Sequence, residues 1–314
     1  MRRINDEKDY PPFGRQVYKE VPRMGFLDFF YPSEDNLLLH GRVYGEKNLG
    51  RPVVCLPGIN RNVRDFHELA LYLSTALRNP RKVIALDYRG RGRSANDENI
   101  SNYNITVEAR DVLTGLDFLG VEEAAFIGTS RGGLVIHILA VLKPSILKAV
   151  VLNDSGPKFE PQGLAEIKTR IDQAPWPKSF AEAVEKQQMI NATDFPSFGS
   201  SDWKRLVTCM YRETEDGTLV PDLDLKLLAR LTAENVKPLP DLWEQFQLLS
   251  TIPLLVVRGE NSRLISTAIM NEMHYRHSGM EAITVLGQGH PPLLETGDLP
   301  KIIADFIDRS EARK

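Results

Sequence analysis

The most constraining feature of this sequence is a glycine-rich turn between two apolar runs. Residues 125–127 are apolar and lead into Gly128-Thr129-Ser130-Arg131-Gly132, and a second apolar run follows over residues 134–139. The first run is typical of a buried strand and the second of a helix, so the chain must reverse direction within a few residues. Glycines permit such crowding because larger side chains would collide with the neighbouring backbone. The turn therefore predicts a strand–turn–helix unit that exposes the Ser130 hydroxyl at its corner.

Short apolar runs alternate with amphipathic segments along most of the chain. The runs typical of buried strands lie at 53–56, 83–86, 124–127, 147–152, 253–257 and 282–286. Helical patterns lie at 63–75, 106–119, 132–142 and about 299–310. Residues 26–31 and 36–44 flank a turn and predict a β-hairpin. Because strands that alternate with helices form parallel sheets, this order predicts an α/β fold with a mostly parallel sheet and helices on both faces.

Residues 157–250 interrupt this alternation. The segment is rich in proline, has helical patterns at 180–189 and 223–231, and shows no clear strand pattern. It also holds all three tryptophans of the chain. Since buried aromatic side chains contribute large contact areas, we expect a mostly helical cap whose aromatic residues pack on the core. The predicted core then comprises residues 1–156 and 251–314, and the predicted cap residues 157–250.

Charge and composition exclude several kinds of partner. The chain has 39 lysines and arginines against 42 acidic residues, and a net charge of −3 gives no basic surface for nucleic acid. No stretch approaches the roughly 20 apolar residues that span a bilayer, and the first residues lack the apolar core of a signal peptide. We therefore expect a cytoplasmic protein with neither nucleic acid nor membrane as a partner. Cys55 and Cys209 are expected to be unlinked thiols.

Two further turns are expected to face the serine. His290 follows a glycine-containing loop directly after the last predicted strand, at the carboxyl end of the sheet, where catalytic groups gather. An imidazole there can act as the base that a serine nucleophile needs. The turn at 56–62 follows the first buried strand, and its Ile59 N–H is expected to point at the same spot as the Arg131 N–H. Such a pair of amides can stabilise an oxyanion. His40 is interpreted as structural.

Arginines lie close to these turns. Arg61 and Arg131 flank them, and a guanidinium binds a carboxylate through two parallel hydrogen bonds. We therefore expect a substrate that carries a carboxylate to be held there, with Arg61 as the binding residue. A second group, Arg89, Arg91 and Arg93, is expected to fix its loop through salt bridges and to remain exposed to solvent.

Two patterns in the sequence have the spacing of a cofactor or metal site. Residues 90–95, Gly-Arg-Gly-Arg-Ser-Ala, match the G-x-G-x-x-A form of a dinucleotide fingerprint. A polar loop rather than an apolar helix follows them, and they belong to the second strand of the parallel series. His274 and His277 have helical spacing, but no nearby acidic or thiol ligand completes a metal site. We therefore expect neither a cofactor nor a metal.

Taken in chain order, these parts resemble the α/β-hydrolase family from Phe26 onward. The segments that carry the resemblance are 57–62, 87–94, 128–132 and 289–291. The resemblance implies an α/β-hydrolase fold with a cap, in which Ser130 is the nucleophile and His290 the base. It also implies that the amides of Ile59 and Arg131 form the oxyanion hole.

The activity implied by the resemblance is that of a carboxylesterase-like or lactonase-like hydrolase. Such an enzyme cleaves an ester, thioester or lactone of a small molecule through an acyl-enzyme on Ser130. Two alternatives remain open at this point. One is hydrolysis of a carbon–carbon bond on the same fold, and the other is ligand binding on a degenerate hydrolase scaffold.

One position departs from the family pattern. Arg263 stands where the triad aspartate is usual in the branch that this chain resembles. An inward-pointing guanidinium about 4 Å from a protonated imidazole would cost about 4 kcal/mol at an effective dielectric of about 20. Either Arg263 turns away or activity is impaired. Two carboxylates are candidates for the missing acid, Asp154 after the sixth strand and Glu260 near the seventh. Asp154 is favoured because its strand adjoins that of Ser130.

Overall fold

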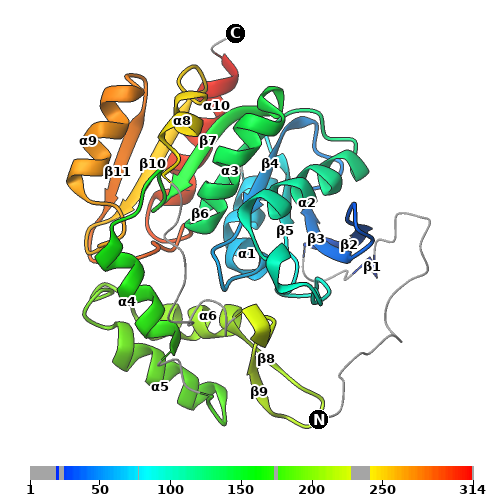
Figure 1. The fold of residues 1–314 in the computed structure, drawn as a ribbon, viewed down its shortest axis with the longest axis vertical. Coiled ribbons are helices and arrows are strands. Elements are labelled where there is room, and N and C mark those ends of the chain that lie inside the picture. Colours follow the sequence, from blue (N-terminus) through cyan, green and yellow to red (C-terminus); the bar gives the residue numbers. More distant parts are fainter. Residues whose placement is uncertain (1–18, 21–24, 77, 173–175, 228–240, 313–314) are drawn as a thin grey trace.

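A mostly parallel sheet of nine strands forms the centre of the computed structural model, which describes residues 19–20, 25–76, 78–172, 176–227 and 241–312 (Figure 1). The strand order is β1-β2-β3-β5-β4-β6-β7-β10-β11. The strands are β1 (Lys19–Glu20), β2 (Phe26–Pro32), β3 (Leu38–Tyr44), β4 (Gly50–Leu56), β5 (Arg81–Leu86), β6 (Ala124–Thr129), β7 (Leu147–Asn153), β10 (Leu254–Gly259) and β11 (Glu281–Val285). Strands β5 to β11 in that order are parallel, and β1, β2 and β3 pair antiparallel. The predicted strands, hairpin and fold class are confirmed.

Helices cover both faces of the sheet. One face carries the turn η2 (Val63–Phe66), α1 (His67–Leu71), the π-helical turn η3 (Tyr72–Ala76) and α10 (Leu299–Ala312). The other face carries α2 (Ile105–Phe118), α3 (Arg131–Leu142), α8 (Trp243–Gln247) and α9 (Thr267–Arg276). Two short 3₁₀ turns, η4 (Ile100–Asn102) and η5 (Pro144–Ile146), lie in the connections. This arrangement is the predicted one, although the helix expected over 63–75 is broken into three pieces.

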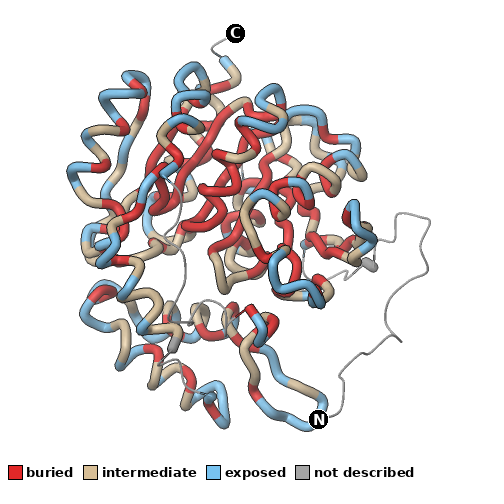
Figure 2. The backbone as a smooth tube through the Cα atoms, viewed as in Figure 1, coloured by how far each residue is buried: buried red, intermediate tan, exposed pale blue. Residues whose placement is uncertain are grey.

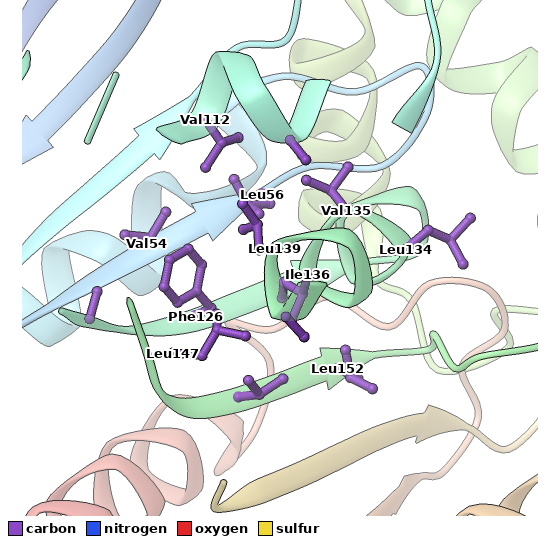
Figure 3. Packing of buried hydrophobic residues seen from close by; sticks show 14 of the residues in the cluster. Val54, Leu56, Val112, Phe126, Leu134, Val135, Ile136, Leu139, Leu147 and Leu152 are labelled. Carbon is purple, nitrogen blue, oxygen red and sulfur yellow. The ribbon is translucent and has the colours of Figure 1, made fainter. Parts of the chain in front are cut away.

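Alternating side chains divide the core into two layers. In β4, Val54 and Leu56 belong to the cluster beneath α2 and α3, whereas Val53 and Cys55 belong to the cluster beneath α1 and α10. Successive side chains of a strand point to opposite faces, and all four are fully buried. Figure 3 shows the first layer, with Phe126 of β6 among its labelled residues. The sheet is therefore buried on both sides, as Figure 2 also shows.

The register of the central strands aligns their carboxyl ends. Leu56 of β4 pairs with Gly128 of β6, and Thr129 of β6 pairs with Asn153 of β7. The residues that follow these strands therefore emerge side by side at one edge of the sheet. This edge is where the sequence places its candidate turns.

Between β7 and β10 the chain leaves the sheet. It forms α4 (Pro161–Asp172), α5 (Phe180–Asn191), α6 (Ser200–Met210) and the hairpin β8 (Tyr211–Glu213) to β9 (Leu219–Pro221), which lie together below the sheet in Figure 1. The hairpin was not expected, although its Asp216-Gly217 turn is a recognised hairpin signal and Gly217 has φ +81°. The helix predicted at 223–231 lies partly outside the described residues. The cap boundaries at 157 and 250 stay a prediction.

The aromatic residues of this segment behave differently from one another. Trp203 is buried and packs edge-on against Phe195 and Phe198 within the segment itself. Trp176 is exposed. Trp243 packs edge-on against Phe246, which belongs to the core cluster of α3. The expectation that all of them join the cap to the core is therefore wrong for the exposed Trp176.

The chain after β9 is tied to the loop that follows β5. Two backbone hydrogen bonds of 3.1 and 2.7 Å and one antiparallel bridge join residues 222–224 to residues 90–92. The carboxylate of Asp222 also pairs with Arg64 at 2.5 Å and accepts a hydrogen bond of 3.1 Å from Asn62. We call this contact the clasp. Separately, none of the helices in the described residues has the length and apolar character that crossing a membrane requires.

Candidate active site

Ser130 lies at a sharp corner between β6 and α3, as the sequence predicts. It has φ +52° and ψ −112°, a strained backbone conformation that residues other than glycine rarely adopt. A Cβ on Gly132 would lie 2.1 Å from the Leu56 carbonyl oxygen, and one on Gly128 would lie 2.6 Å from the Gly132 carbonyl carbon. Only glycine fits at these two positions. The tight packing holds the corner and leaves the Ser130 side chain at the carboxyl edge of the sheet.

A chain of two hydrogen bonds joins three side chains from three separate loops. The Nε2 atom of His290 lies 2.9 Å from Ser130 Oγ, and its Nδ1 atom lies 2.6 Å from Asp154 Oδ2. Asp154 follows β7 directly and is fully buried, whereas the side chain of His290 is 12% exposed. A carboxylate on Nδ1 fixes the imidazole so that Nε2 can accept the serine proton. The structure brings together the three residues that the sequence analysis selected.

The backbone of Asp154 is held as firmly as its side chain. Asp154 has φ +46°, its N–H donates to the Val257 carbonyl at 2.7 Å, and Oδ1 accepts a hydrogen bond of 3.3 Å from the Gly259 N–H. Both partners belong to β10, so the neighbouring strand locks the carboxylate toward His290. The position after β7 therefore supplies an acid without help from the loop after β10.

Arg263 and Glu260, both after β10, lie away from His290. The side chain of Arg263 is 56% exposed, and its Nη1 lies 2.7 Å from Glu166 Oε1 of α4. Glu260 is exposed and accepts a hydrogen bond from the Gly287 N–H at 2.8 Å. Arg263 thus turns outward, and the repulsion expected for an inward guanidinium does not arise. Of the two candidate acids, Asp154 contacts His290 and Glu260 does not.

Two amides the sequence reasoning did not single out support the His290 loop. Asn153 Nδ2 donates to the Pro292 carbonyl at 3.0 Å and to Thr129 Oγ1 at 3.1 Å. Gln288 Oε1 accepts a hydrogen bond of 2.9 Å from the Leu293 N–H. Asn153 stands directly before Asp154 at the end of a buried strand, and a buried amide at that point is the signal that could have found it.

The turn after β4 lies against the serine. A Cβ built on Gly58 would lie 3.9 Å from Ser130 Cβ, so the backbone of this turn approaches the nucleophile closely. Within the described residues, no acceptor is found for the N–H of Ile59. Arg131 is the first residue of α3, where backbone amides lack an intrahelical acceptor and the helix dipole favours negative charge. Both amides therefore have the surroundings that an oxyanion hole requires.

The side chains of the two flanking arginines, Arg61 and Arg131, lie in different places relative to the serine. Arg131 is buried, and its Nε donates to Glu108 Oε2 at 2.6 Å, so the expectation that this guanidinium holds a substrate carboxylate is wrong. A buried carboxylate attracts it away from the site. Arg61 lines the cavity at the serine and binds Asp65 through Nε at 2.8 Å and Nη2 at 2.7 Å. Of the pair, Arg61 lines the cavity and Arg131 does not.

A cavity of about 160 Å³ opens above Ser130 and His290. Helices α4, α5 and α6 contribute apolar side chains to its wall, including Ile167, Ile190 and Leu206. This volume lies below the roughly 300–1,000 Å³ of pockets for drug-sized ligands, so the cavity favours a ligand smaller than those. The cavity is thus formed jointly by the sheet edge and the segment between β7 and β10.

Besides Arg61 and Asp65, the cavity wall carries a second ion pair. Arg205 Nη2 of α6 lies 2.9 Å from Glu295 Oε1, in the loop after His290. Burial raises the pKa of Glu295 to about 7, although Arg205 acts in the opposite direction. Sequence reasoning missed this pair because no local motif marks it. The wall therefore holds two arginine–carboxylate pairs and a third arginine, Arg170. Of the two carboxyl groups in these pairs, that of Glu295 has the pKa raised to about 7.

The loop arginines after β5 fix their loop, as expected. Arg89 pairs with Asp111 at 2.7 Å, Arg91 with Glu108 at 2.8 Å, and Arg93 with Asp28 at 2.5 Å. The expectation of solvent exposure is wrong for the first two, which are buried because carboxylates lie beneath them.

The fingerprint-like glycines at 90 and 92 serve the same loop. A Cβ on Gly92 would lie 2.2 Å from an oxygen of Asp87. That carboxylate accepts hydrogen bonds from the N–H groups of Val63, at 2.8 Å, and Arg93, at 3.1 Å. In a dinucleotide site the backbone amides of such a turn face a phosphate. Here the chain's own carboxylate occupies the turn.

Comparisons with known proteins agree with this geometry. A family model described as alpha/beta hydrolase fold matches residues 51–198. A 3-hydroxybutyrate-oligomer hydrolase of Cupriavidus necator is 30% identical over 282 residues, which cover 86% of this chain and 92% of that protein. A 2-(acetamidomethylene)succinate hydrolase of Mesorhizobium japonicum is 25% identical over 84% of this chain and 90% of its own. The crystal structure of an alpha/beta hydrolase from Novosphingobium aromaticivorans has a TM-score of 0.83 and 32% identity, covering 91% and 99% of the two chains. With this fold and these relatives, the chain belongs to the α/β-hydrolase family and is a hydrolase.

Proposed function

We propose that this hydrolase cleaves carboxylic esters of small, carboxylate-bearing substrates through an acyl-enzyme on Ser130. The observation that carries the proposal is the hydrogen-bonded chain from Ser130 through His290 to Asp154, which ends in a cavity. A serine hydroxyl is a weak nucleophile on its own and becomes reactive when an oriented base accepts its proton. The chain has that base and the group that orients it.

In the acylation step, Ser130 Oγ attacks the ester carbonyl carbon while its proton passes to His290 Nε2. Asp154 accepts the Nδ1–H hydrogen bond and stabilises the imidazolium that forms. The carbonyl oxygen becomes an oxyanion, which the amides of Ile59 and Arg131 stabilise by about 3 kcal/mol each. The intermediate then collapses, and the C–O bond to the alcohol breaks as His290 returns the proton to the leaving oxygen.

In the deacylation step, water takes the place of the alcohol. His290 Nε2 accepts a proton from the water as its oxygen attacks the acyl carbon. The second tetrahedral intermediate uses the same two amides, and its collapse releases the acid and returns the proton to Ser130. No other group is needed to complete this cycle.

The cavity wall supports a substrate with a carboxylate. Arg61 and Arg205 both line it, and each binds a carboxylate of the chain that a substrate carboxylate can replace. Arg205 has the weaker competitor, because Glu295 is neutral in part of its population near pH 7. Two relatives have names that specify acids, 3-hydroxybutyrate oligomers and an acetamidomethylene succinate. Short oligoesters of 3-hydroxy acids, which combine ester bonds with one terminal carboxylate, are the first candidates.

The first experiment is covalent labelling with a fluorophosphonate, read by intact mass, for the unmodified protein and for Ser130→Ala. We expect one adduct per chain in the unmodified protein and none in the variant. The labelled enzyme is then compared with the free enzyme on a 3-hydroxybutyrate dimer and on the methyl ester of that dimer. Thioesters, lactones and a vinylogous β-diketone in the same panel separate the other acyl bonds and carbon–carbon cleavage.

The outcomes divide the proposal into parts. An adduct that also forms on Ser130→Ala, or no adduct together with no hydrolysis, would remove Ser130 as the nucleophile. An adduct with equal rates on the acid and its methyl ester would keep the ester hydrolase and remove the carboxylate preference.

A further inference from the structure

Three buried charged side chains lie beneath the two turns that face the serine. Glu108 of α2 is fully buried, with Oε2 2.6 Å from Arg131 Nε and Oε1 2.8 Å from Arg91 Nη1. Arg91 is fully buried as well, and the side chain of Arg131 is 8% exposed. We call these three residues the bridge cluster. Such a cluster is held tightly because separating buried opposite charges is costly.

The bridge cluster reaches both oxyanion turns. Arg91 Nε donates to the Ile59 carbonyl at 3.0 Å, and its Nη1 donates to the Arg89 carbonyl at 2.8 Å. At the other end, Arg131 is itself the residue whose amide faces the oxyanion. Glu108 thus connects the two donor residues through one ion pair on each side.

We propose that Glu108 is a positioning residue that holds the amides of Ile59 and Arg131 at the spacing an oxyanion needs, with Arg91 as its link to Ile59. The inference rests on the proposed function, since the oxyanion exists only during acyl transfer. Donors stabilise an oxyanion when they lie about 2.7–3.1 Å from it, so a small movement of either turn removes most of their effect. The turn at Ile59 has no regular secondary structure of its own to fix it.

The charge of the bridge cluster acts in the same direction. Two guanidinium groups face one carboxylate, so the cluster carries one more positive than negative charge. In a buried environment of low dielectric, this surplus favours negative charge at the donors above it. Burial opposes ionisation of Glu108, but Arg131 and Arg91 outweigh it and lower the pKa of the carboxyl group. Glu108 is therefore charged in the working enzyme.

A second buried pair in the same loop and helix provides a matched control. Arg89 binds Asp111 through Nε at 2.8 Å and Nη2 at 2.7 Å, and both residues are buried. Arg89 is two residues before Arg91, and Asp111 is about one helical turn after Glu108. The remaining side-chain bonds of Arg89 go to Asp35 and Asp97 rather than to the oxyanion turns. Breaking this pair removes a comparable ion pair without touching either donor.

The experiment compares Glu108→Gln and Arg91→Lys with Asp111→Asn and Arg89→Lys in the full-length chain. The measurements are kcat and KM on a reactive ester, the inhibition constant of a trifluoromethyl ketone that forms the tetrahedral adduct, the inhibition constant of the product acid, and Tm. Glu108→Gln is expected to lower kcat by about 100-fold and to weaken the ketone by a similar factor. KM and the product constant should change by less than about three-fold. Asp111→Asn and Glu108→Gln should lower Tm by similar amounts, because each breaks a buried ion pair. In Asp111→Asn, however, kcat should stay within about three-fold of the unmodified enzyme.

Arg91→Lys keeps the positive charge but loses the directed Nε–H bond to Ile59. It should show the same pattern as Glu108→Gln, with a smaller loss of kcat of about ten-fold, and it remains informative if Glu108→Gln fails to fold. The inference would be overturned if kcat fell in proportion to Tm both in the variants of Glu108 and Arg91 and in those of Asp111 and Arg89. The role of the bridge cluster would then be purely structural. An unmodified protein that neither hydrolyses esters nor reacts with the fluorophosphonate would overturn the proposed function together with it. Normal labelling and normal ketone affinity in Glu108→Gln would overturn the inference alone.

Discussion

Two histidines of this chain each have an aspartate at Nδ1, but the rest of their surroundings differ. His290 Nδ1 lies 2.6 Å from Asp154, and His40 Nδ1 lies 2.7 Å from Asp87. The difference is at Nε2. In His290 this atom faces the Ser130 hydroxyl at 2.9 Å, whereas in His40 it faces a second carboxylate, Asp28, at 2.9 Å. His290 borders a cavity, and His40 is fully buried.

The comparison shows that an Asp–His pair is not enough to make a catalytic base. In His40 each ring nitrogen faces a carboxylate, so neither nitrogen is open to a substrate proton. A ring with a carboxylate on one side and a hydroxyl on the other keeps Nε2 as an acceptor. His40 therefore joins β3 to the loop after β5, whereas His290 keeps Nε2 next to the Ser130 hydroxyl, as its proposed role as base requires.

The largest expected effect comes from removing the nucleophile or the base. Ser130→Ala and His290→Ala should each lower kcat/KM by about 10⁵-fold or more, because the two residues act as one unit. Tm should change little, since neither side chain is part of a hydrophobic cluster. Steady-state ester hydrolysis and thermal unfolding measure the two quantities. A residual rate above about 1% in either variant would contradict the assigned roles.

The next effect concerns the acid of each pair. Asp154→Asn should lower kcat by about 10³ to 10⁴-fold, because the amide orients the wrong tautomer of His290. Asp28→Asn is the control from the other histidine and should leave kcat within about three-fold. The pre-steady-state rate of acylation is the sharpest measurement. An unchanged rate in Asp154→Asn would remove this residue from the site and return attention to Glu260.

Replacing the structural histidine, His40, should lower the stability of the protein and leave kcat nearly unchanged. His40→Gln leaves two buried carboxylates without their shared partner, and such a change costs about 3 kcal/mol. Urea unfolding should detect the loss as a lower midpoint with an unchanged slope. Ester hydrolysis under native conditions should stay within about three-fold. A large loss of kcat with full stability would mean that the two histidines are not separated in role.

The pH dependence of stability sharpens the same contrast. Burial alone would raise the pKa of Asp28, but His40 and Arg42 outweigh burial and lower it from 3.8 to about 2. A lowered carboxyl pKa contributes stability that is present above about pH 4 and is lost as the pH falls toward 2. The difference in the free energy of unfolding between the unmodified protein and His40→Gln should therefore become smaller as the pH falls from 4 to 2. A difference that stays constant between pH 4 and pH 2 would mean that ionised Asp28 does not contribute to the stabilisation by His40.

The smallest expected effect lies in the cavity beside His290. Because the pKa of Glu295 is about 7, this carboxyl gains charge as the pH rises from 6 to 8 and competes more strongly for Arg205. KM for an anionic ester should then rise by up to about five-fold, and KM for its neutral methyl ester should not. Glu295→Gln should abolish the rise. A pH-independent KM for the anionic ester would remove Arg205 from substrate binding.

Local sequence signals predicted the framework of the fold and of the site. The serine turn, the parallel strands and the position of His290 follow from glycines and apolar runs that lie close together in the chain. Asp154 could be predicted for the same reason, since it directly follows β7, the strand that lies beside β6 and hence beside Ser130. In each case the evidence is a pattern within a few residues, which backbone geometry converts into a position at the sheet edge.

Contacts between distant segments were beyond the sequence. Glu108 binds one arginine from the loop after β5 and one from the start of α3, and Glu295 contacts Arg205 of α6 in the cavity wall. The outward direction of Arg263 depends on Glu166, which belongs to another helix. No local pattern encodes such pairings, because they arise only when packing brings the segments together. The same reason explains why the side chain of Arg131 was expected in the site and is found beneath it.

The clasp has a consequence for exchanging parts between related enzymes. Residues 222–224 pair with residues 90–92, and Arg91 in that loop also holds the Ile59 carbonyl. A donor segment spliced in at 157 and 250 would bring its own side chains for a new substrate. It would have to reproduce this short strand-like pairing as well, or the transplanted enzyme would bind its new substrate and turn it over slowly. Chimaeras of this family should therefore be designed with loop 90–92 and its partner segment moved as one unit.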